Sequence, residues 1–287
     1  MADALPVCLL NGALVPTAQA RISPFDRGFL FGDGIYEVVP CYGGKPFRLQ
    51  AHFDRMQAGL DAIEIANPYS HARWSELVGE LIAANGAGDL GIYIEITRGP
   101  EPGRDFLPQA ATTPTVFGFC WRLTPARLEQ LERGFSAATL DDIRWLRCDI
   151  KSVALLGPVM LRMEAKRRGA DEAILIRGDY LAEGSSSAVC IVKDGRVVTP
   201  PPSQTRLPSI TRVVVGEVVA AVGLPLDVRE VHRDELYAAD EIWIASSTRE
   251  TVPITTIDGR TVGNGKAGAI WRRIFDEFQA FKKRESK

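Results

Sequence analysis

Three two-residue turn sequences, each set between short apolar runs, constrain the fold of this chain more than any other feature. They are Asn-Gly at 11–12, Gly-Gly at 43–44 and Asp-Gly at 194–195. Asparagine, aspartate and glycine tolerate the positive φ angles of tight hairpin turns, so each pair predicts two antiparallel strands joined by a short turn. Because the turns are spread along the chain, we expect β-hairpins in both its halves.

Segments with apolar residues at helical spacing separate these hairpins. The first lies near 51–65, and the second follows Ser70, a preferred N-cap residue, and ends at Asn85. Further helices are predicted near 153–168, 210–222 and 265–283. Additional strands are predicted at 91–96, 115–120, 148–151, 173–176 and 241–245. This mixture of helices and hairpins predicts an α+β protein.

The chain is long enough for two domains, since domains usually hold about 100–200 residues. The composition changes around Pro125, so we predict a small N-terminal domain at 1–120, a linker at 121–127 and a larger C-terminal domain at 128–287. A loop at 99–114 is rich in proline and glycine. A loop of that length inside a compact domain is usually functional or mobile.

Composition excludes several classes of function. Apolar residues make up 46% of the chain, the net charge is −2 and the pI is about 6.0, which gives no support for binding to nucleic acid or to an anionic membrane. No apolar run approaches the length of a membrane-spanning helix. The first residues lack the basic region of a signal peptide. Five dispersed cysteines and three distant histidines argue for reduced thiols and against a metal site, so we expect a cytoplasmic enzyme.

Lys151 stands in an apolar setting in a chain whose basic residues are mostly arginine. It is the only lysine between Lys45 and Lys166, and its segment alternates from Cys148 onward as a strand would. Desolvation favours the neutral form of an amine, and a neutral lysine amine is a nucleophile that can form a Schiff base. By itself the pattern is better explained by a surface lysine whose charged end reaches water.

A Schiff-base lysine points to pyridoxal phosphate as cofactor, and that cofactor needs further groups. Its pyridine nitrogen needs a carboxylate, for which Glu183, beside Gly184 and three serines, is the candidate. Its phosphate needs a cation and a helix N-terminus. The candidates for the phosphate are Arg55, Ile210, Thr211, Ser246 and Ser247. A turn glutamate, a solvated arginine and ordinary helix capping would explain the same residues without a cofactor.

Taken together, five segments resemble the fold-type IV pyridoxal-phosphate enzymes, and among these the D-amino-acid aminotransferases. They are 26–39, 52–55, 142–152, 183–187 and 210–212. The resemblance covers nearly the whole chain in order, and the segment 142–152 is its most specific part. It implies a two-domain fold of type IV and a homodimer whose active site lies between the domains and near the subunit interface.

The resemblance also assigns roles to residues. Lys151 would be the catalytic lysine, and Glu183 would hold the proton of the pyridine nitrogen. Arg55, Ile210, Thr211, Ser246 and Ser247 would bind the phosphate, Leu207 would pack on the cofactor ring, and Tyr36, Arg104 and Ser186 would face the substrate.

The chain departs from the D-amino-acid aminotransferases where the substrate is expected to bind. Their Arg-x-His pair, which captures the substrate carboxylate, is missing from the 99–114 loop. An arginine, Arg104, is displaced by one position, and the histidine is absent. Pro40 replaces a lysine after the Tyr-Glu-Val-Val strand, and Ala188 replaces an asparagine after the triple serine. Arg104 is either a substrate ligand that pairs with a carboxylate or a surface charge of the loop.

The expected function is therefore a transaminase that moves an amino group from a D-amino acid to a 2-keto acid such as pyruvate or 2-oxoglutarate. Its expected partners are these small molecules and a second copy of the chain. An (R)-selective amine transaminase is the first alternative, because the carboxylate-binding pair is altered. A lyase of the aminodeoxychorismate type is the second. A non-enzymatic protein that binds the cofactor is the last.

Overall fold

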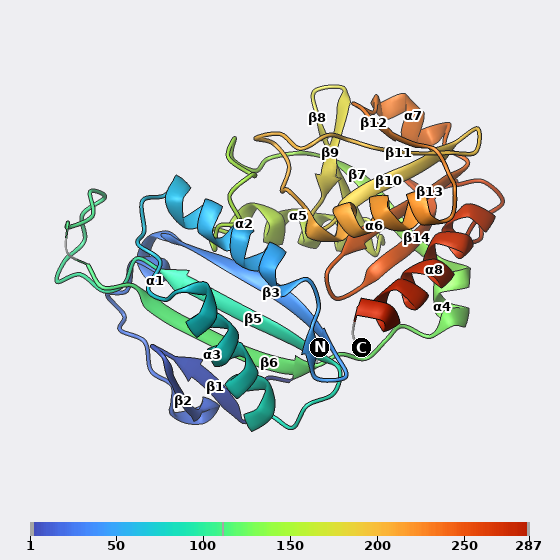
Figure 1. Cartoon of the computed structure of the whole chain (residues 1–287). Helices are drawn as coiled ribbons and strands as arrows, with labels where there is room; N and C mark the ends of the chain where they lie inside the picture. The colour runs from blue at the N-terminus through green and yellow to red at the C-terminus, as the bar shows by residue number, and fades with distance from the viewer. Residues whose placement is uncertain (1–2, 111, 286–287) are drawn as a thin grey trace. The chain divides into compact units, whose positions relative to one another are not determined.

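A computed structural model of the chain describes residues 3–110 and 112–285, which form two compact units. The first unit contains the described residues up to 124 together with the short segment 150–155. The second contains residues 125–149 and 156–285. Each unit has its own sheet and its own helices (Figure 1), so the two are described in turn.

The first unit is built on a six-stranded antiparallel sheet in the order β2-β1-β6-β5-β3-β4. Its strands are β1 (Val7–Leu10), β2 (Ala13–Pro16), β3 (Gly34–Tyr42), β4 (Lys45–Pro46), β5 (Leu90–Thr97) and β6 (Thr115–Arg122). A 3-10 turn, η1 (Thr17–Gln19), and a short helix, α1 (Arg27–Phe31), precede β3. The long central strands β3, β5 and β6 pair along most of their length, so they form the rigid part of the unit.

Two helices, α2 (Leu49–Ala62) and α3 (His71–Ala84), cover one face of this sheet (Figure 1). Their apolar sides, which include Phe53 and Trp74, join the alternate inward residues of the strands in one buried cluster. The opposite face carries half-buried aromatic side chains, because a strand directs successive residues to opposite faces. The helix-covered face is therefore the core of the first unit.

The second unit contains a nine-stranded mixed sheet in the order β12-β11-β10-β13-β14-β7-β8-β9, with β15 paired to β14. Its strands are β7 (Phe135–Asp141), β8 (Glu172–Arg177), β9 (Tyr180–Gly184), β10 (Ala188–Lys193), β11 (Arg196–Thr199), β12 (Leu226–Val228), β13 (Glu241–Ser246), β14 (Glu250–Ile257) and β15 (Arg260–Thr261). The pairs β11–β12, β7–β14 and β7–β8 are parallel, and the others are antiparallel.

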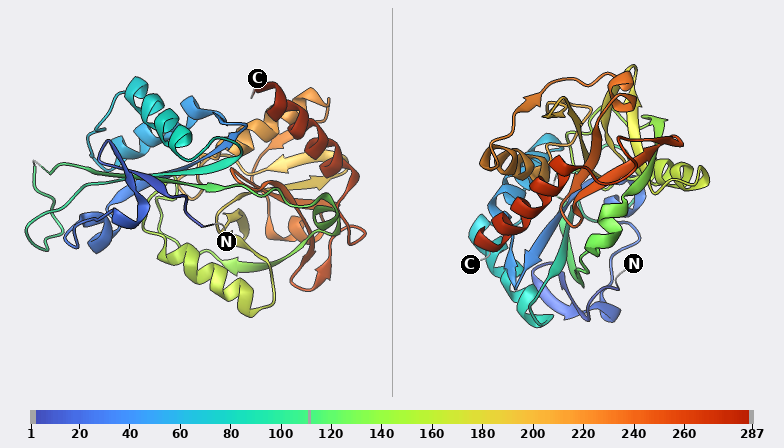
Figure 2. Two further views of the ribbon diagram at one scale, coloured as in Figure 1. Left: turned by 90° about the horizontal axis from the view of Figure 1, so that it is seen from below. Right: turned by 90° about the vertical axis from the view of Figure 1, so that its right-hand side faces the viewer.

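The helices of the second unit form two groups. Those of the described chain are α4 (Leu128–Arg133), α5 (Leu156–Arg167), α6 (Ile210–Ala221), α7 (Arg233–Tyr237) and α8 (Ala269–Glu285). The helices α6 and α8 pack on one another and on β13, whereas α5 packs against β7 and β8, away from that pair (Figure 2). The valine-rich side of α6 is buried, so its N-terminus is fixed relative to the sheet.

The three predicted hairpins are confirmed. Each turn has both of its residues at positive φ, as in Asn11 at 49° and Gly12 at 85°. The five predicted helices are also confirmed within a few residues, and the Ser70 hydroxyl caps α3 by accepting from the Arg73 amide at 3.3 Å. These features depend on local geometry, which explains why the sequence predicts them.

The predicted strand at 148–151 is wrong. Residues 142–155 form an irregular segment in which only Ser152 makes an isolated bridge, to Ile35. Four alternating residues are too few to specify a strand, and Asp149 is held by the guanidinium of its neighbour Arg147 at 3.0 Å. The chain passes from the second unit to the first after residue 149 and returns after residue 155.

The boundary between the units, after residue 124, falls inside the segment 121–127 predicted as the linker. The first two residues of that segment, Trp121 and Arg122, belong to β6. The segment 150–155 lies in the first unit, whereas the residues on both sides of it lie in the second.

Among the described residues no helix is long and apolar enough to span a bilayer. Nor do the histidine, cysteine, aspartate and glutamate side chains of that part gather in a group able to hold a metal ion.

Candidate active site

Lys151 lies on a segment that continues the sheet of the first unit beyond β3. The Tyr36 amide donates to the Lys151 carbonyl at 2.9 Å, and the Val153 amide donates to the Gly34 carbonyl at 3.1 Å. These bonds occupy the edge of β3 that does not pair with β5. The Lys151 side chain extends over Tyr36, with Nζ 4.1 Å from the centroid of its ring, which is within cation–π distance.

Lys151 differs from the other half-buried lysines of the described chain. Lys193 pairs with Asp240 at 3.4 Å, and Lys282 pairs with Glu250 at 2.6 Å. Lys151 is also half-buried, but its amine faces an aromatic ring, and no carboxylate forms an ion pair with it in the described part of the chain. An amine placed in this way can react with a carbonyl compound.

Tyr36 belongs to a row of aromatic rings on the face of the sheet opposite α2 and α3. Its ring stacks on Tyr93 at 5.5 Å, and the Tyr93 hydroxyl donates to Glu95 at 2.7 Å. Burial and the neighbouring Glu95 raise the pKa of the Tyr93 hydroxyl, and burial raises the pKa of the Glu95 carboxyl. The Tyr93 hydroxyl therefore stays protonated and fixes the ring against which Tyr36 lies.

Arg55 is held by a fully buried carboxylate, Glu37, which is the neighbour of Tyr36 on β3. The guanidinium of Arg55 donates from Nε and Nη2 to the two oxygens of Glu37, both at 2.7 Å, and His52 Nδ1 lies 2.7 Å from Oε2. Burial by itself would raise the pKa of Glu37, but Arg55 and His52 outweigh it and lower that pKa to about 2. The pKa of His52 is lowered by its burial, so a neutral imidazole donates to an ionised carboxylate.

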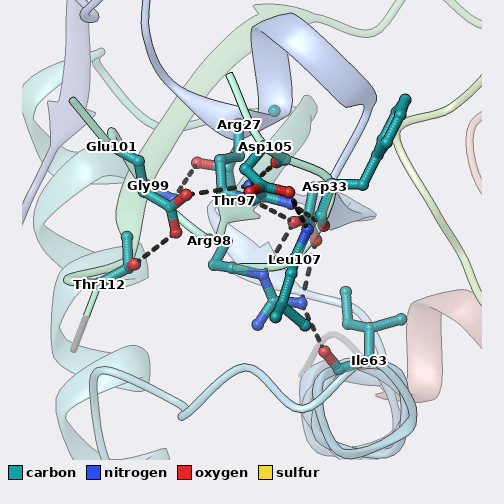
Figure 3. Close-up of polar contacts among 12 residues, drawn as sticks. Arg27, Asp33, Ile63, Thr97, Arg98, Gly99, Glu101, Asp105, Leu107 and Thr112 are labelled. Carbon is teal, nitrogen blue, oxygen red and sulfur yellow. Dashed lines mark hydrogen bonds and ion pairs between the residues drawn. The ribbon is translucent and has the colours of Figure 1, made fainter. Parts of the chain in front are cut away.

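The loop after β5 is organised around the buried guanidinium of Arg27 (Figure 3). Arg27 donates from Nε to Asp33 at 2.8 Å and from Nη1 to Glu101 at 3.0 Å. It also donates to the carbonyl oxygens of Asp105 at 2.7 Å and Phe106 at 2.9 Å. One side chain of α1 therefore fixes the loop at three places.

Two further groups extend this network. Asp33 also accepts from Arg98, whose guanidinium reaches the Ile63 carbonyl at the end of α2 at 2.7 Å (Figure 3). Glu101 accepts from the Gln109 amide and the Thr112 hydroxyl, both at 2.8 Å. Residues 99–112 thus form an ordered loop where they are described, although none of them belongs to a helix or strand.

Arg104, the candidate for the substrate carboxylate, lies at the exposed tip of this loop. Its guanidinium carbon is 5.4 Å from the ring centroid of Phe31 and 5.2 Å from that of Phe106. Phe106 itself is 76% exposed. The arginine is therefore positioned by aromatic rings, on a part of the loop that solvent reaches.

Glu183 lies near the end of β9 in the second unit and is only 7% exposed. The Arg144 guanidinium donates from Nη1 to its Oε1, and the Leu207 amide donates to its Oε2 at 3.2 Å. Burial raises the pKa of the Glu183 carboxyl, and Arg144 opposes the effect without cancelling it. This carboxylate is therefore suited to hold a proton jointly with a ligand.

A second arginine, Arg206, fixes the strand backbone just before this carboxylate. It donates to the carbonyl oxygens of Leu181 at 3.0 Å and Ala182 at 3.1 Å, and it pairs with Glu230 at 2.9 Å. Because Arg206 immediately precedes Leu207, the loop that donates to Glu183 and the strand that carries Glu183 are joined by one side chain. A small pocket beside them is lined by Glu183, Leu207 and Arg212, among others.

The three serines at 185–187, which follow Glu183 and Gly184, differ in their exposure to solvent. Ser185 and Ser187 are buried, and their hydroxyls have no hydrogen-bond partner among the described residues. Ser186, the candidate for substrate contact, is exposed. Buried polar groups normally have hydrogen-bond partners. Two buried hydroxyls without such partners in the described chain are therefore typical of a site whose hydrogen bonds are completed by a ligand.

The N-terminus of α6 has the form expected of an anion site. Ser209 caps the helix by accepting from the Arg212 amide at 3.2 Å. The amides of Ile210 and Thr211 precede that bond, and the first amides of an α-helix have no acceptor within the helix. Ser246 ends β13, against which α6 packs, and Ser247 follows in the turn to β14.

The predicted site residues thus fall into two groups, and each group belongs to one of the two units. Lys151, Tyr36 and Arg55 lie in the first unit, together with Arg104 at its loop tip. The groups around Glu183 and the helix N-terminus lie in the second. The residues that sequence reasoning missed are the buried partners of these groups: Glu37, His52, Arg27, Arg144 and Arg206.

Comparison with known proteins identifies the chain. Residues 34–257 match the amino-transferase class IV family. The chain belongs to this family. The D-alanine aminotransferase of Bacillus licheniformis is 39% identical to this aminotransferase over 266 residues, which are 93% of each chain.

Solved structures agree with this aminotransferase in fold. The branched-chain aminotransferase of the archaeon Thermoproteus uzoniensis, solved with norvaline, matches with a TM-score of 0.88 at 26% identity, over 99% of this chain and 97% of that one. A fold IV-transaminase from Curtobacterium pusillum matches with a TM-score of 0.81 at 27% identity, over 95% and 92%. The predicted α+β fold of type IV is therefore confirmed.

Proposed function

We propose that this aminotransferase uses pyridoxal phosphate to move an amino group from a D-amino acid to a 2-keto acid such as pyruvate or 2-oxoglutarate. The observation that carries the proposal is the Lys151 amine, half-buried over the ring of Tyr36 and without a carboxylate partner in the described chain. The likeness to D-alanine aminotransferases over nearly the whole chain supports the choice of D-amino acids as donors.

The residues present fit the cofactor. Glu183 offers a buried carboxylate, two buried hydroxyls at 185 and 187 lack partners in the described chain, and the start of α6 offers its first amides to an anion. The cofactor, when bound, supplies a ring that accepts the electron pair left on the substrate carbon. The chain supplies the groups that bind that ring and move protons around it.

Lys151 is the proposed acid–base residue. Its Nζ would take the proton from the α-carbon of the substrate and deliver it to the C4′ carbon of the cofactor. One amine can serve both purposes, because it both holds the cofactor and transfers protons. Tyr36 fixes the direction of this amine through its ring. Glu183 is proposed to keep the pyridine nitrogen protonated.

The phosphate is assigned to the amides of Ile210 and Thr211, with Ser246 and Ser247 in support. A helix N-terminus favours an anion because its first amides are unpaired and the helix dipole is positive there. Arg55 is the proposed cation, and its bidentate contact with Glu37 keeps it in one orientation. Leu207 is proposed to pack on the cofactor ring.

Substrate contact is assigned to Tyr36, Ser186 and Arg104. Arg104 is exposed and lies between aromatic rings, so it is positioned to meet a carboxylate that approaches from solvent. A planar guanidinium binds a carboxylate through two parallel hydrogen bonds. The assignment of Arg104 therefore depends on a substrate that carries a carboxylate.

An absorbance titration tests the proposed function. The purified protein, saturated with pyridoxal phosphate, is mixed in turn with D-alanine, L-alanine and (R)-1-phenylethylamine. We expect the visible band of the lysine-bound cofactor to be lost with D-alanine and restored by pyruvate. Loss with L-alanine alone would contradict the choice of D-amino acids, and the absence of any visible band would contradict the role of Lys151.

An (R)-selective amine transaminase is the second candidate. The observation that favours it is the loop at 99–112, which lacks the expected histidine and presents Arg104 among aromatic rings. Such a surface suits an aromatic amine as well as a carboxylate. Loss of the visible band with (R)-1-phenylethylamine but not with D-alanine would identify this activity.

We also propose that two copies of the chain form a homodimer through α5. The side chains of Leu156, Val159, Met160 and Met163 recur at helical spacing and are between 49% and 72% exposed. The segment 143–146 adds three more exposed apolar side chains next to this helix. Exposed apolar side chains that recur on one helix face are typical of a protein interface.

A further inference from the structure

Glu183 has two hydrogen-bond donors of very different strength. The Leu207 amide is neutral and lies 3.2 Å from Oε2, whereas the Arg144 guanidinium is charged and contacts Oε1. A charged donor lowers the basicity of a carboxylate much more than a neutral amide does. Arg144 therefore determines how strongly Glu183 attracts a proton.

The Arg144 guanidinium is itself held by a second carboxylate, that of Asp142. Its Nε and Nη2 donate to the two oxygens of Asp142 at 2.8 and 2.9 Å, and its Nη2 also lies 3.3 Å from the Thr205 carbonyl. The Asp142 side chain is fully buried and accepts a further bond from Arg177 at 2.8 Å. Burial alone would lower the pKa of the Arg144 guanidinium, but the two carboxylates raise it, so the residue is a permanent cation.

The four side chains form a row of alternating charge, from Arg177 through Asp142 and Arg144 to Glu183. Asp142 favours protonation of Glu183, as any nearby anion does, but Arg144 lies between them and has the opposite effect. Burial also favours protonation of Glu183. The guanidinium is thus the group that keeps this buried carboxyl able to ionise.

This balance matters for the proposed function, on which the present inference rests. A single proton is shared between the Glu183 carboxylate and the pyridine nitrogen of the cofactor. If the carboxylate is the stronger base, the proton moves to oxygen and the ring is neutral. If the carboxylate is the weaker base, the proton stays on nitrogen, and the ring carries the charge that attracts electrons. The number of protons is the same in both cases.

We propose that Arg144 is a positioning residue that makes Glu183 less basic than burial alone would leave it, so that the shared proton stays on the pyridine nitrogen of the cofactor. Arg144 contacts the carboxylate and acts through it. Asp142 fixes the guanidinium in the orientation that this contact requires. The segment 142–144 would therefore serve the chemistry of the ring, in addition to leading the chain toward Lys151.

The test measures the ring nitrogen directly. The holoenzyme is loaded with pyridoxal phosphate labelled with nitrogen-15 in the ring, and its NMR shift is compared in the native protein, Arg144→Met and Arg144→Lys. We expect the shift of a protonated ring in the native protein and in Arg144→Lys. We expect the shift of a neutral, hydrogen-bonded ring in Arg144→Met. An unchanged shift in Arg144→Met would overturn the inference.

Arg177→Met is the matched control. It removes an arginine that shares Asp142 with Arg144 but that makes no ion pair with Glu183 in the described chain. We expect the ring nitrogen to stay protonated in this variant. A neutral ring in Arg177→Met as well would mean that any loss of charge in the network has this effect, and it would overturn the specific role of Arg144.

A second readout uses the cofactor-free protein. Glutamate labelled in its carboxyl carbon allows Glu183 to be titrated by NMR, with Glu183→Gln to assign its signal. We expect Arg144→Met to raise the pKa of Glu183 by about one unit or more, and an unchanged pKa would overturn the inference. Should Arg144→Met fail to fold, Asp142→Asn combined with Arg144→Met removes both members of the buried pair, which proteins tolerate better than one unpaired charge.

The two proposals fail in different ways. A native protein that forms no lysine-bound cofactor contradicts the proposed function, and this inference with it. A native protein with a bound cofactor and a protonated ring, whose ring stays protonated in Arg144→Met, contradicts the inference alone.

Discussion

Two buried carboxylates, Glu37 and Glu183, show how the number of charged donors decides the state of a residue. Both lose hydration, which raises the pKa of a carboxyl. Glu37 receives two bonds from Arg55 and one from His52, and its pKa falls to about 2. Glu183 receives one bond from an arginine and one from an amide, and its pKa is raised. Glu37 is therefore a fixed structural anion, and Glu183 is suited to share a proton.

The first prediction concerns Lys151→Ala. We expect this variant to lose transamination entirely, because it loses the amine over Tyr36 that holds the cofactor and moves protons. Its circular dichroism spectrum should match that of the native protein, since the Lys151 carbonyl, which the variant keeps, makes the bond to β3. Lys193→Ala removes another half-buried lysine and should remain active. Measurable turnover by Lys151→Ala would rule out the assignment.

A second prediction concerns the pH dependence of stability through Glu37. Its pKa is about 2 in the folded protein and about 4.5 when unperturbed. Because the folded state favours the ionised form, the stabilisation is complete above pH 4.5 and is lost as the pH falls toward 2. The shift corresponds to roughly 3 kcal/mol at neutral pH. The free energy of unfolding of the native protein should therefore approach that of Glu37→Gln on acidification.

Urea unfolding of both proteins from about pH 2 to about pH 7 measures this convergence. Glu76→Gln supplies the control, because Glu76 pairs with Arg73 on the exposed side of α3. Exposed ion pairs contribute little to stability, so its difference from the native protein should change little with pH. A gap between native protein and Glu37→Gln that stays constant through acidification would show that Glu37 is not the stabilising anion.

At the scale of elements, the loop at 99–112 depends on a residue outside it. Arg27 on α1 contacts Glu101 and the carbonyl oxygens at 105 and 106, so three points of the loop share one guanidinium. Loops without regular structure are ordered by such contacts, and they become mobile when the contacts are removed. The order of this loop is therefore set by α1.

The third prediction follows from this arrangement. Arg27→Met should increase limited proteolysis and amide hydrogen exchange between residues 101 and 110 at least several-fold, with little change in α2 and α3. Arg98→Met is the control, because Arg98 shares Asp33 with Arg27 but reaches the end of α2 and not the loop tip. Equal exchange of the loop in both variants would show that the loop is ordered by its own contacts.

The sequence predicts elements well where local geometry decides them. The hairpin turns need positive φ angles and have residues that accept them, and the helices have clear caps and apolar faces. The segment at 148–151 is the exception, since four alternating residues do not distinguish a strand from an extended loop. The strands β7 and β14 are not evident from the sequence. They pair in parallel with one another, and a strand beside a parallel neighbour often shows no alternation.

The site is predictable only in part, for a related reason. Lys151 and Glu183 stand out through their unusual neighbours in the sequence. Their buried partners do not, because Arg144 and Arg206 look like any of the many arginines of this chain. Only the fold brings Arg144 next to a glutamate 39 positions away, and no local pattern encodes that distance.

At the scale of the whole molecule, the apolar surface of α5 gives the fourth prediction. Met160→Glu combined with Met163→Glu places two charges in the proposed interface and should convert a dimer into a monomer, as measured by light scattering coupled to gel filtration. Lys283→Glu, which makes the same change of charge at an exposed lysine of α8, should leave the dimer intact. A native protein that is monomeric, or a double variant that stays dimeric, would contradict the proposed interface.

The path of the chain through Lys151 has a consequence for how the protein can be divided. The reactive lysine belongs to the first unit in space but to the second in sequence, since residues 150–155 join the sheet of β3 and the chain then returns. A gene cut between the units after residue 124 would leave the lysine on one product and the strand that holds it on the other. Neither product alone would contain both the lysine and the strand that holds it, so neither could be a smaller enzyme with this chemistry.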